Sequence, residues 1–155
     1  MPFEIEHKYL IKYDLWSKVI PDESKPVKQG YVSATPVSSV RVRTMGDKGY
    51  VTIKGKSSNA SRLEYEYEIP LSEAEEMLAT FCSQDIIKTR HYVRHGDHIW
   101  EVDEFHGLNS GLIVAEIELS SVDEKYELPP WVDVNVTADK RYTNANLVLK
   151  PFSTW

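Results

Sequence analysis

Apolar and charged side chains alternate in about eight segments of this chain, and this pattern constrains the fold more than any other. In a β-strand successive side chains point to opposite faces, so residues 3–10 place Glu4, Glu6 and Lys8 on one face. Residues 46–49 and 95–98 are rich in types that tolerate positive φ and predict hairpin turns. We therefore expect an antiparallel sheet whose further strands cover residues 28–34, 38–45, 50–54, 62–69, 86–95, 99–105 and 112–119.

Few helices are expected beside these strands. Short apolar patterns and proline stops predict helices over 13–20, 73–82, 121–128 and 137–149, the last with Thr137 as its N-cap. Residues 21–26, 55–59 and 133–136 are predicted to be loops or irregular. With 155 residues, 41% of them hydrophobic, the chain is expected to form a single α+β domain over 1–155.

The charged face of the predicted sheet carries charges of like sign two residues apart. The first strand alone resembles an ordinary solvent-exposed polar face, but the same pairing recurs on its neighbours. Like charges along one face repel each other, so stabilisation of the fold does not explain them. The basic pairs are Arg41/Arg43 and Lys88/Arg90, and the acidic pairs are Glu4/Glu6, Glu64/Glu66, Glu101/Asp103 and Glu116/Glu118.

Closure of the sheet into a barrel gives these charges a role. If the apolar face lies outward under the helices, the charged face lines a water-filled lumen. Basic residues there would bind a highly charged anion, and acidic pairs would hold hard cations that bridge to it. The expected ligand is a polyphosphate chelated by Mg²⁺ or Mn²⁺, gripped by side chains, because the sequence has no glycine-rich phosphate loop.

Composition narrows the partners. The formal net charge of −6 disfavours nucleic acid or an anionic membrane as the main partner. One cysteine, Cys82, allows no intrachain disulfide, and neither a leader nor a membrane-spanning apolar run is evident. A cytoplasmic protein is expected. Apolar outer strands left uncovered by so few helices would favour a homodimer.

The ordered motifs resemble the CYTH family, the triphosphate tunnel metalloenzymes. The N-terminal Glu4-x-Glu6-x-Lys8 is similar to the signature of that family. Matching stretches follow in family order along nearly the whole chain, and the short length is most similar to bacterial members that hydrolyse inorganic tripolyphosphate. These stretches are 29–31, 40–43, 52–54, 64–66, 88–90, 101–103, 115–118 and 139–142.

The resemblance implies an eight-stranded antiparallel closed β-barrel, with helices packed outside and a C-terminal helix. It implies metal ligation by Glu4, Glu6, Glu116 and Glu118, with Glu64, Glu66 and Asp103 as second candidates. The residues that it places on the triphosphate are Lys8, Arg41, Arg43, Lys54, Arg62, Lys88 and Arg90.

The expected reaction is attack of a metal-activated water on a terminal phosphorus, with two metal ions, releasing phosphate and pyrophosphate. The resemblance also maps a catalytic tyrosine–lysine pair onto Tyr31 and Lys54, and the alternative for Tyr31 is a packing or stacking role. Three other functions stay open at this point: a class IV adenylyl cyclase, a thiamine triphosphatase, and a polyphosphate- or nucleotide-binding module without activity.

Overall fold

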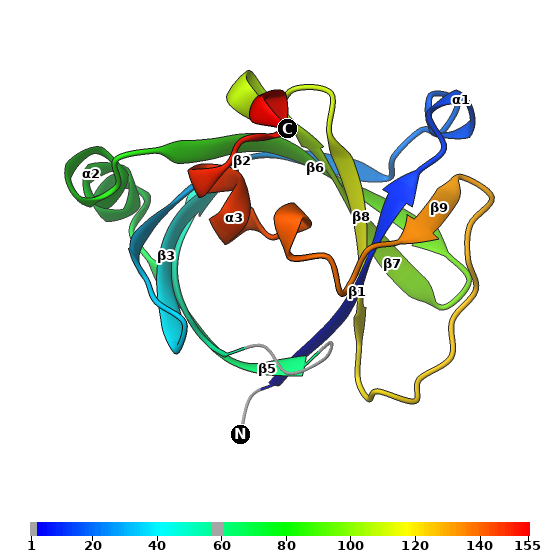
Figure 1. The fold of residues 1–155 in the computed structure, drawn as a ribbon, viewed down its shortest axis with the longest axis horizontal. Coiled ribbons are helices and arrows are strands. Elements are labelled where there is room, and N and C mark those ends of the chain that lie inside the picture. Colours follow the sequence, from blue (N-terminus) through cyan, green and yellow to red (C-terminus); the bar gives the residue numbers. More distant parts are fainter. Residues whose placement is uncertain (1–2, 57–60) are drawn as a thin grey trace.

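The computed structural model describes residues 3–56 and 61–155, and within them nine antiparallel strands form one sheet that closes on itself (Figure 1). The strands follow the order β5-β4-β3-β2-β6-β7-β8-β1-β9, and β5 also pairs with β1. Their bounds are β1 Phe3–Ile11, β2 Glu23–Ala34, β3 Ser38–Met45, β4 Lys48–Gly55, β5 Ser61–Ile69, β6 Asp85–His95, β7 His98–Phe105, β8 Ile113–Leu119 and β9 Val132–Asn135.

The first strand closes the barrel by dividing one of its edges between two partners. Its N-terminal part pairs with β5, where Glu4 lies opposite Arg62. Its C-terminal part pairs with β9, where Ile11 lies opposite Val132, and its other edge pairs with β8. The predicted eight-stranded closed barrel is therefore confirmed. Residues 133–136, expected to be irregular, instead contribute most of β9, because the second half of β1 offers them a free edge.

Hydrophobic residues pack against the outside of the barrel, as the alternation predicts. Trp100, Val102 and Ile117 point outward from β7 and β8 into a cluster that Trp131 completes. On the opposite side, helix α2 (Leu71–Phe81) covers Val42 of β3. The charged face is thus left for the interior.

At one end, the interior face turns apolar. Ile86, Phe105 and Val114 share their strand faces with the charged interior residues, yet they pack together in a cluster with Leu147 of α3 (Asn144–Leu149). Figure 1 shows α3 within the ring of strands, above part of its opening. The C-terminal helix therefore helps to close one end of the barrel.

Both predicted hairpin turns are present. Gly46 joins β3 to β4 with a φ of 60°, and Gly96 joins β6 to β7 with a φ of 61°. Glycine adopts this left-handed conformation at little steric cost, which is the property that the sequence pattern relied on. The polar loop expected over 55–59 lies largely outside the described residues.

Several other elements predicted from the local sequence pattern were wrong. The helix predicted over 121–128 is absent from this described segment, because the Tyr126 hydroxyl shares hydrogen bonds with His7 and Tyr9 and holds the chain as a loop. The loop predicted over 21–26 ends early, since β2 begins at Glu23 and pairs with β6 from that residue.

The predicted C-terminal helix over 137–149 is shorter than expected. Thr143, and not Thr137, caps α3, and its hydroxyl accepts a hydrogen bond from the Asn146 amide at 3.3 Å. Thr137 instead accepts from the backbone amide of Lys8 at 3.0 Å, which ties this segment to β1. The remaining elements are α1 Tyr13–Trp16, η1 Gly107–Asn109, η2 Lys140–Tyr142 and η3 Phe152–Thr154. None of the helices in the described residues is long and apolar enough to cross a membrane.

Candidate active site

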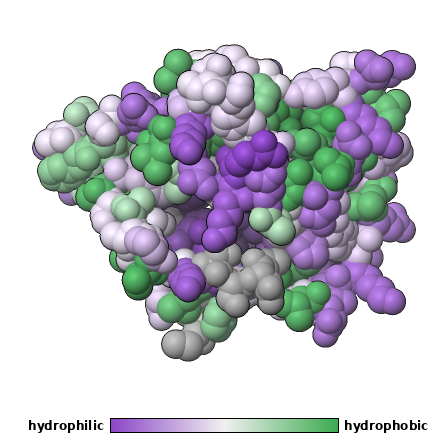
Figure 2. All heavy atoms as spheres, in the orientation of Figure 1, coloured by the Kyte–Doolittle hydropathy of each residue, from purple (hydrophilic) through white to green (hydrophobic). Residues whose placement is uncertain are grey.

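A cavity of about 280 Å³ occupies the interior of the barrel, and hydrophilic residues gather in and above the hollow that marks its mouth (Figure 2). Its volume is just below the roughly 300–1,000 Å³ of ordinary ligand pockets, whose linings are mostly apolar. This lining is mostly charged. It consists of Glu4, Glu6, Lys8, Tyr31, Ser39, Arg41, Arg43, Met45, Lys54, Arg62, Glu64, Glu66, Arg90, Tyr92, Glu101, Glu116, Glu118, Thr143, Asn144 and Ala145.

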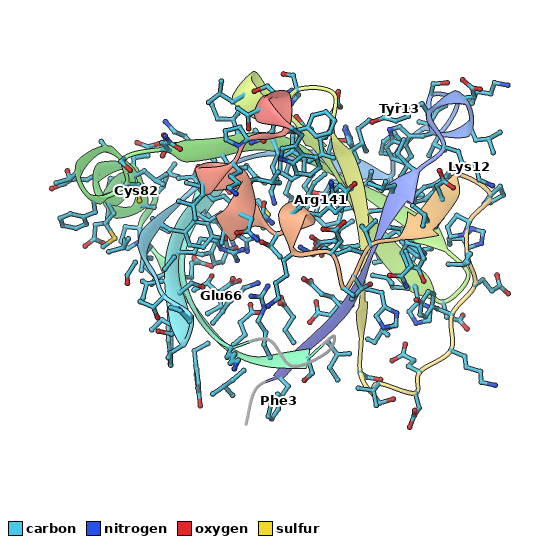
Figure 3. All side chains as sticks on the ribbon, viewed as in Figure 1. Phe3, Lys12, Tyr13, Glu66, Cys82 and Arg141 are labelled. Carbon is cyan, nitrogen blue, oxygen red and sulfur yellow. The ribbon has the colours of Figure 1, made fainter. Side chains whose placement is uncertain are left out.

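Strand β3 supplies two adjacent guanidinium groups to the cavity wall. Arg41 and Arg43 are both about nine-tenths buried, and Glu66 of β5 accepts a bond from Arg43 at 3.2 Å. Figure 3 shows Glu66 directed into the ring of strands. The Nε atoms of both arginines are buried without a hydrogen-bond partner among the described residues. Burial, together with the charges of Arg41 and Arg90, lowers the pKa of Arg43. Two crowded cations with unused donors form a site for an anion.

Lysines of the cavity are held by carboxylates that come from other strands. The ammonium of Lys54 on β4 donates to Glu4 on β1 at 3.0 Å, and that of Lys8 lies 3.4 Å from Glu116 on β8. Burial and the nearby charge of Arg41 lower the pKa of Lys54. In this state the cations and the carboxylates of the cavity neutralise one another, so a triphosphate would have to displace carboxylates from the lysines.

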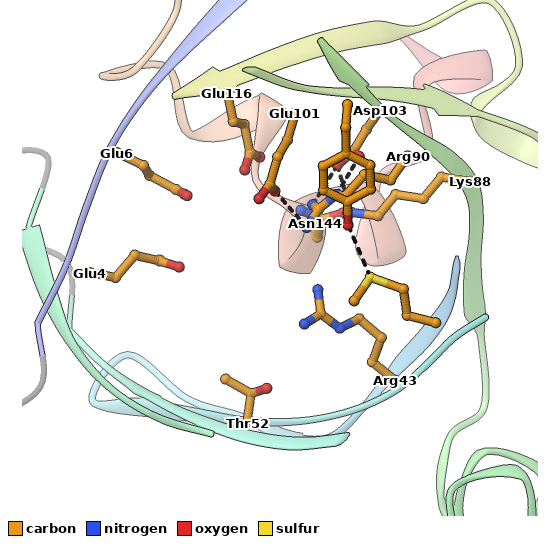
Figure 4. Close-up of polar contacts among 12 residues, drawn as sticks. Glu4, Glu6, Arg43, Thr52, Lys88, Arg90, Glu101, Asp103, Glu116 and Asn144 are labelled. Carbon is orange, nitrogen blue, oxygen red and sulfur yellow. Dashed lines mark hydrogen bonds and ion pairs between the residues drawn. The ribbon is translucent and has the colours of Figure 1, made fainter. Parts of the chain in front are cut away.

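A buried network stands beside the cavity. Asp103 accepts bonds from Lys88 at 2.8 Å and from Arg90 at 2.8 Å, and Lys88 also donates to Asn144 of α3 at 3.1 Å (Figure 4). The Lys88 side chain is fully buried and does not line the cavity, and burial lowers its pKa to about 8. Lys88 therefore lies next to the expected phosphate site but not in its lining. Asp103, a second candidate for metal binding, is already paired with two cations.

Carboxylates converge on the opposite side of the cavity. Glu6 lies directly opposite Glu118 in the β1–β8 pair, and Glu101 lies opposite Glu116 in the β7–β8 pair. Figure 4 shows Glu4, Glu6, Glu101 and Glu116 all pointing into the ring. Burial and the charge of Glu116 raise the pKa of Glu6 to about 8. Like charges in direct cross-strand positions are unfavourable unless a cation lies between them.

The donor chemistry of this group fits a hard divalent cation. Carboxylate oxygens are the protein ligands that Mg²⁺ and Mn²⁺ prefer. Among the described residues no three acidic, histidine or cysteine side chains already form a metal cage, because lysines and arginines engage several of the carboxylates. Burial and a hydrogen bond with Glu4 raise the pKa of Glu64 to about 7. Burial makes the ionised form of such carboxylates costly, and a bound cation would offset that cost.

The expected tyrosine–lysine pair is present in the cavity but is not in contact. Tyr31 and Lys54 both belong to the lining. Within the described residues no hydrogen bond joins them, and Glu4 is the partner of the Lys54 ammonium. Joint action of the two side chains would require Lys54 to leave that carboxylate.

Sequence reasoning missed part of the lining. Glu101 was recognised as a member of an acidic pair but was not among the named ligands, although it contacts Arg90 at 2.7 Å. Tyr92 follows Arg90 by two residues, so the alternation of β6 could have identified it. Thr143, Asn144 and Ala145 reach the cavity because α3 packs within the end of the barrel, and no local pattern signals that position.

Comparisons with known proteins agree with this geometry. Residues 2–146 match the model of the CYTH domain. An inorganic triphosphatase of Acetivibrio thermocellus is 43% identical over 98% of this chain and 97% of its own length. An inorganic triphosphatase of Nitrosomonas europaea is 34% identical over 94% of this chain and 97% of its own length.

Solved structures share the fold. A crystal structure of an inorganic triphosphatase superposes with a TM-score of 0.66 at 31% identity, covering 96% of each chain. A putative adenylate cyclase from Bacillus halodurans gives a TM-score of 0.61 at 18% identity, over 78% of this chain and 83% of that one, which is a likeness of fold alone. With its charged barrel interior and a family match over nearly its whole length, this chain belongs to the CYTH domain family.

Proposed function

We propose that this protein is a metal-dependent inorganic triphosphatase that hydrolyses tripolyphosphate to pyrophosphate and phosphate. One observation carries the proposal: a small cavity inside the barrel is lined mostly by charged groups of both signs, which come from several strands. Its near full-length relatives named inorganic triphosphatases support the same activity.

The charges of the cavity explain why metal ions are needed. Among the described residues, seven carboxylates and six cationic side chains line it. A site with this balance attracts a free polyanion only weakly, whereas bound divalent cations turn the balance positive. Glu4, Glu6, Glu116 and Glu118 would hold Mg²⁺ or Mn²⁺, with two ions expected. Such ions supply an activated water and neutralise charge on the phosphate oxygens.

The basic residues would bind and orient the phosphates. Arg41 and Arg43 present adjacent guanidinium groups with unused Nε donors, and planar guanidinium matches phosphate geometry. Lys8 and Lys54 would exchange their carboxylates for phosphate oxygens, with Arg62 and Arg90 completing the set. Fixed cations of this kind stabilise the charge that develops on a transferring phosphoryl group.

Lys54 is the strongest candidate for acid–base work on the leaving group. Its lowered pKa brings the ammonium closer to the working pH, where proton transfer is most effective. Tyr31 would assist it by sharing a proton once substrate has displaced Glu4. Lys88 would act from beside the cavity, where it fixes Asp103 and hence Arg90.

A phosphate-release assay tests the proposal. Tripolyphosphate, ATP and thiamine triphosphate are supplied separately with Mg²⁺ or Mn²⁺, and cyclic AMP is measured alongside. Release from tripolyphosphate that requires metal and exceeds release from the other two is the expected result. Cyclic AMP formation without phosphate release from tripolyphosphate would overturn it in favour of a cyclase. Cytoplasmic location and a homodimer stay predictions from the sequence.

A further inference from the structure

Buried polar atoms without a partner gather on one wall of the barrel. Among the described residues five side-chain atoms are of this kind: Nε2 and Oε1 of Gln29, Nε of Arg41, Nε of Arg43, and Nε1 of Trp100. The first four lie on β2 and β3, which pair with each other. Buried polar side chains nearly always have a partner, so this concentration indicates an unmet polar contact on that wall.

Gln29 faces the interior of the barrel. A Cβ added to the next residue, Gly30, would lie 2.8 Å from Cys82, so Gly30 faces outward against the end of α2. Neighbouring residues of a strand face opposite ways, which turns Gln29 inward. It is fully buried and lies behind the cavity lining.

Stability does not account for a glutamine at this position. Val27, two residues along the same face, is buried, and so is Ile86, which lies directly opposite on β6. An apolar side chain would suit these neighbours and would leave no amide without a partner. Burial of an unpaired amide destabilises a fold, so another role must explain Gln29.

The neighbour that lacks a matching partner is Arg43. Gln29 and Arg43 are directly paired across β2 and β3, and such residues have Cβ atoms roughly 4.5–5.5 Å apart. One terminal nitrogen of Arg43 donates to Glu66 at 3.2 Å, and the guanidinium lies 5.4 Å from the centre of the Tyr50 ring. Its Nε–H has no acceptor among the described residues, while the amide oxygen of Gln29 has no donor.

We propose that Gln29 is a positioning residue for Arg43. When a phosphate draws the guanidinium away from Glu66, the Gln29 amide oxygen accepts the Arg43 Nε–H and holds the terminal nitrogens toward the anion. A neutral acceptor fixes the guanidinium without cancelling its charge, whereas a carboxylate would compete with the phosphate. This inference rests on the proposed triphosphate function.

The test measures binding and not turnover. Tripolyphosphate is titrated calorimetrically into metal-free protein in EDTA, so that metal-dependent hydrolysis does not consume it. Gln29→Leu should raise the Kd about tenfold, the usual effect of a lost hydrogen bond to a charged group, with an equal or higher melting temperature. Gln29→Glu should raise the Kd further. Trp100→Phe, which removes an unpartnered buried donor outside the barrel, is the matched control and should leave the Kd unchanged.

A double-mutant cycle separates positioning from a general packing effect. Lysine has no Nε–H, so Gln29→Leu should have no further effect on the Kd in an Arg43→Lys background. An unchanged Kd in Gln29→Leu, or the same loss in both backgrounds, would overturn the inference while leaving the proposed function intact. Failure of the wild type to bind tripolyphosphate in EDTA would overturn the inference, while the metal-dependent phosphate-release assay would still decide the proposed function. Binding by the wild type without hydrolysis would contradict the proposed function alone, and the Gln29 comparison would still be decided.

Discussion

Lys54 and Glu4, fifty residues apart in sequence, form an ion pair of 3.0 Å inside the barrel. Lys54 comes from β4 and Glu4 from β1, and β5 lies between the two strands. Each residue is expected to bind a different ligand, Lys54 the phosphate and Glu4 the metal. The same exchange applies to Lys8 and Glu116 at 3.4 Å. Loading of the site is therefore expected to replace internal ion pairs with contacts to substrate and metal.

Glu4→Gln should separate metal binding by Glu4 from phosphate binding by Lys54. Metal-dependent turnover should fall about 100-fold or more, the upper range for loss of a group that supports a metal site. Binding of tripolyphosphate in EDTA should become tighter, because Lys54 loses a competing carboxylate. Calorimetry and a phosphate-release assay measure the two effects.

Glu68→Gln is the control for that substitution, because Glu68 lies on the same strand as Glu64 and Glu66 but is exposed and forms an ion pair with Lys48 at 3.5 Å. Metal-dependent turnover and tripolyphosphate binding in EDTA should both stay at their wild-type values in this variant. Wild-type turnover in Glu4→Gln would remove Glu4 from the metal site.

Asp103→Asn should destabilise the fold strongly. Asp103 is almost completely buried and compensates both Lys88 and Arg90, so the substitution leaves Lys88 with neutral partners and Arg90 with only Glu101 as a charged one. Removal of one partner from a buried pair typically costs about 3–5 kcal/mol of the free energy of unfolding. Urea denaturation measures the loss.

A second change should partly reverse that loss. Replacement of Lys88 by Met in the Asp103→Asn protein removes the uncompensated charge, so the denaturation midpoint should rise again. A single Asp103→Asn variant as stable as the wild type would show that the network beside the cavity does not support the fold.

The metal-free protein should lose stability between about pH 5 and about pH 8. The pKa of Glu6 is raised from 4.5 to about 8 and that of Glu64 to about 7, so the native state binds these protons more tightly than the unfolded chain. Their contribution is complete below about pH 4.5 and is lost as the pH rises through the native values. Lys88, whose pKa is lowered to about 8, begins to act in the opposite direction only at the upper end of this window, and Asp103, whose pKa is lowered, titrates below it.

Urea midpoints across that pH range check the slope, and Glu6→Gln should flatten it. Saturating Mg²⁺ should reverse the trend, because metal binding requires ionised carboxylates. A midpoint that rises with pH in the metal-free wild type would contradict the assignment of Glu6 and Glu64 as the protonated groups.

Lys54→Ala and Tyr31→Phe should distinguish the members of the expected catalytic pair. Loss of the Lys54 ammonium should lower kcat about 100-fold, the usual effect of removing a group that stabilises developing charge. Tyr31→Phe retains the ring and removes only the hydroxyl, so a proton-sharing role predicts a fall in kcat of about tenfold with little change in KM. Steady-state kinetics with tripolyphosphate decide this, and an unchanged kcat in Tyr31→Phe would assign the ring to packing.

The sequence by itself determined which side chains share a face. Alternation is a local property of a strand, so Glu4, Glu6 and Lys8 had to line one side of β1, and like-sign pairs on several strands indicated a charged interior. The hairpin turns at Gly46 and Gly96 could also be predicted, because they depend on a few neighbouring residues. The short helices could not, because segments of this length have marginal helical stability and take the structure that their tertiary contacts favour.

Only the tertiary structure decided which charges meet. Closure of the barrel depends on the register between strands far apart in sequence, and that register pairs Lys54 with Glu4 and sets Gln29 beside Arg43. The packing of α3 within one end of the barrel places Asn144 against Lys88 and keeps that lysine out of the cavity lining. Side-chain direction follows from the chain's own periodicity, whereas side-chain partnership follows from contacts that form only when the barrel closes.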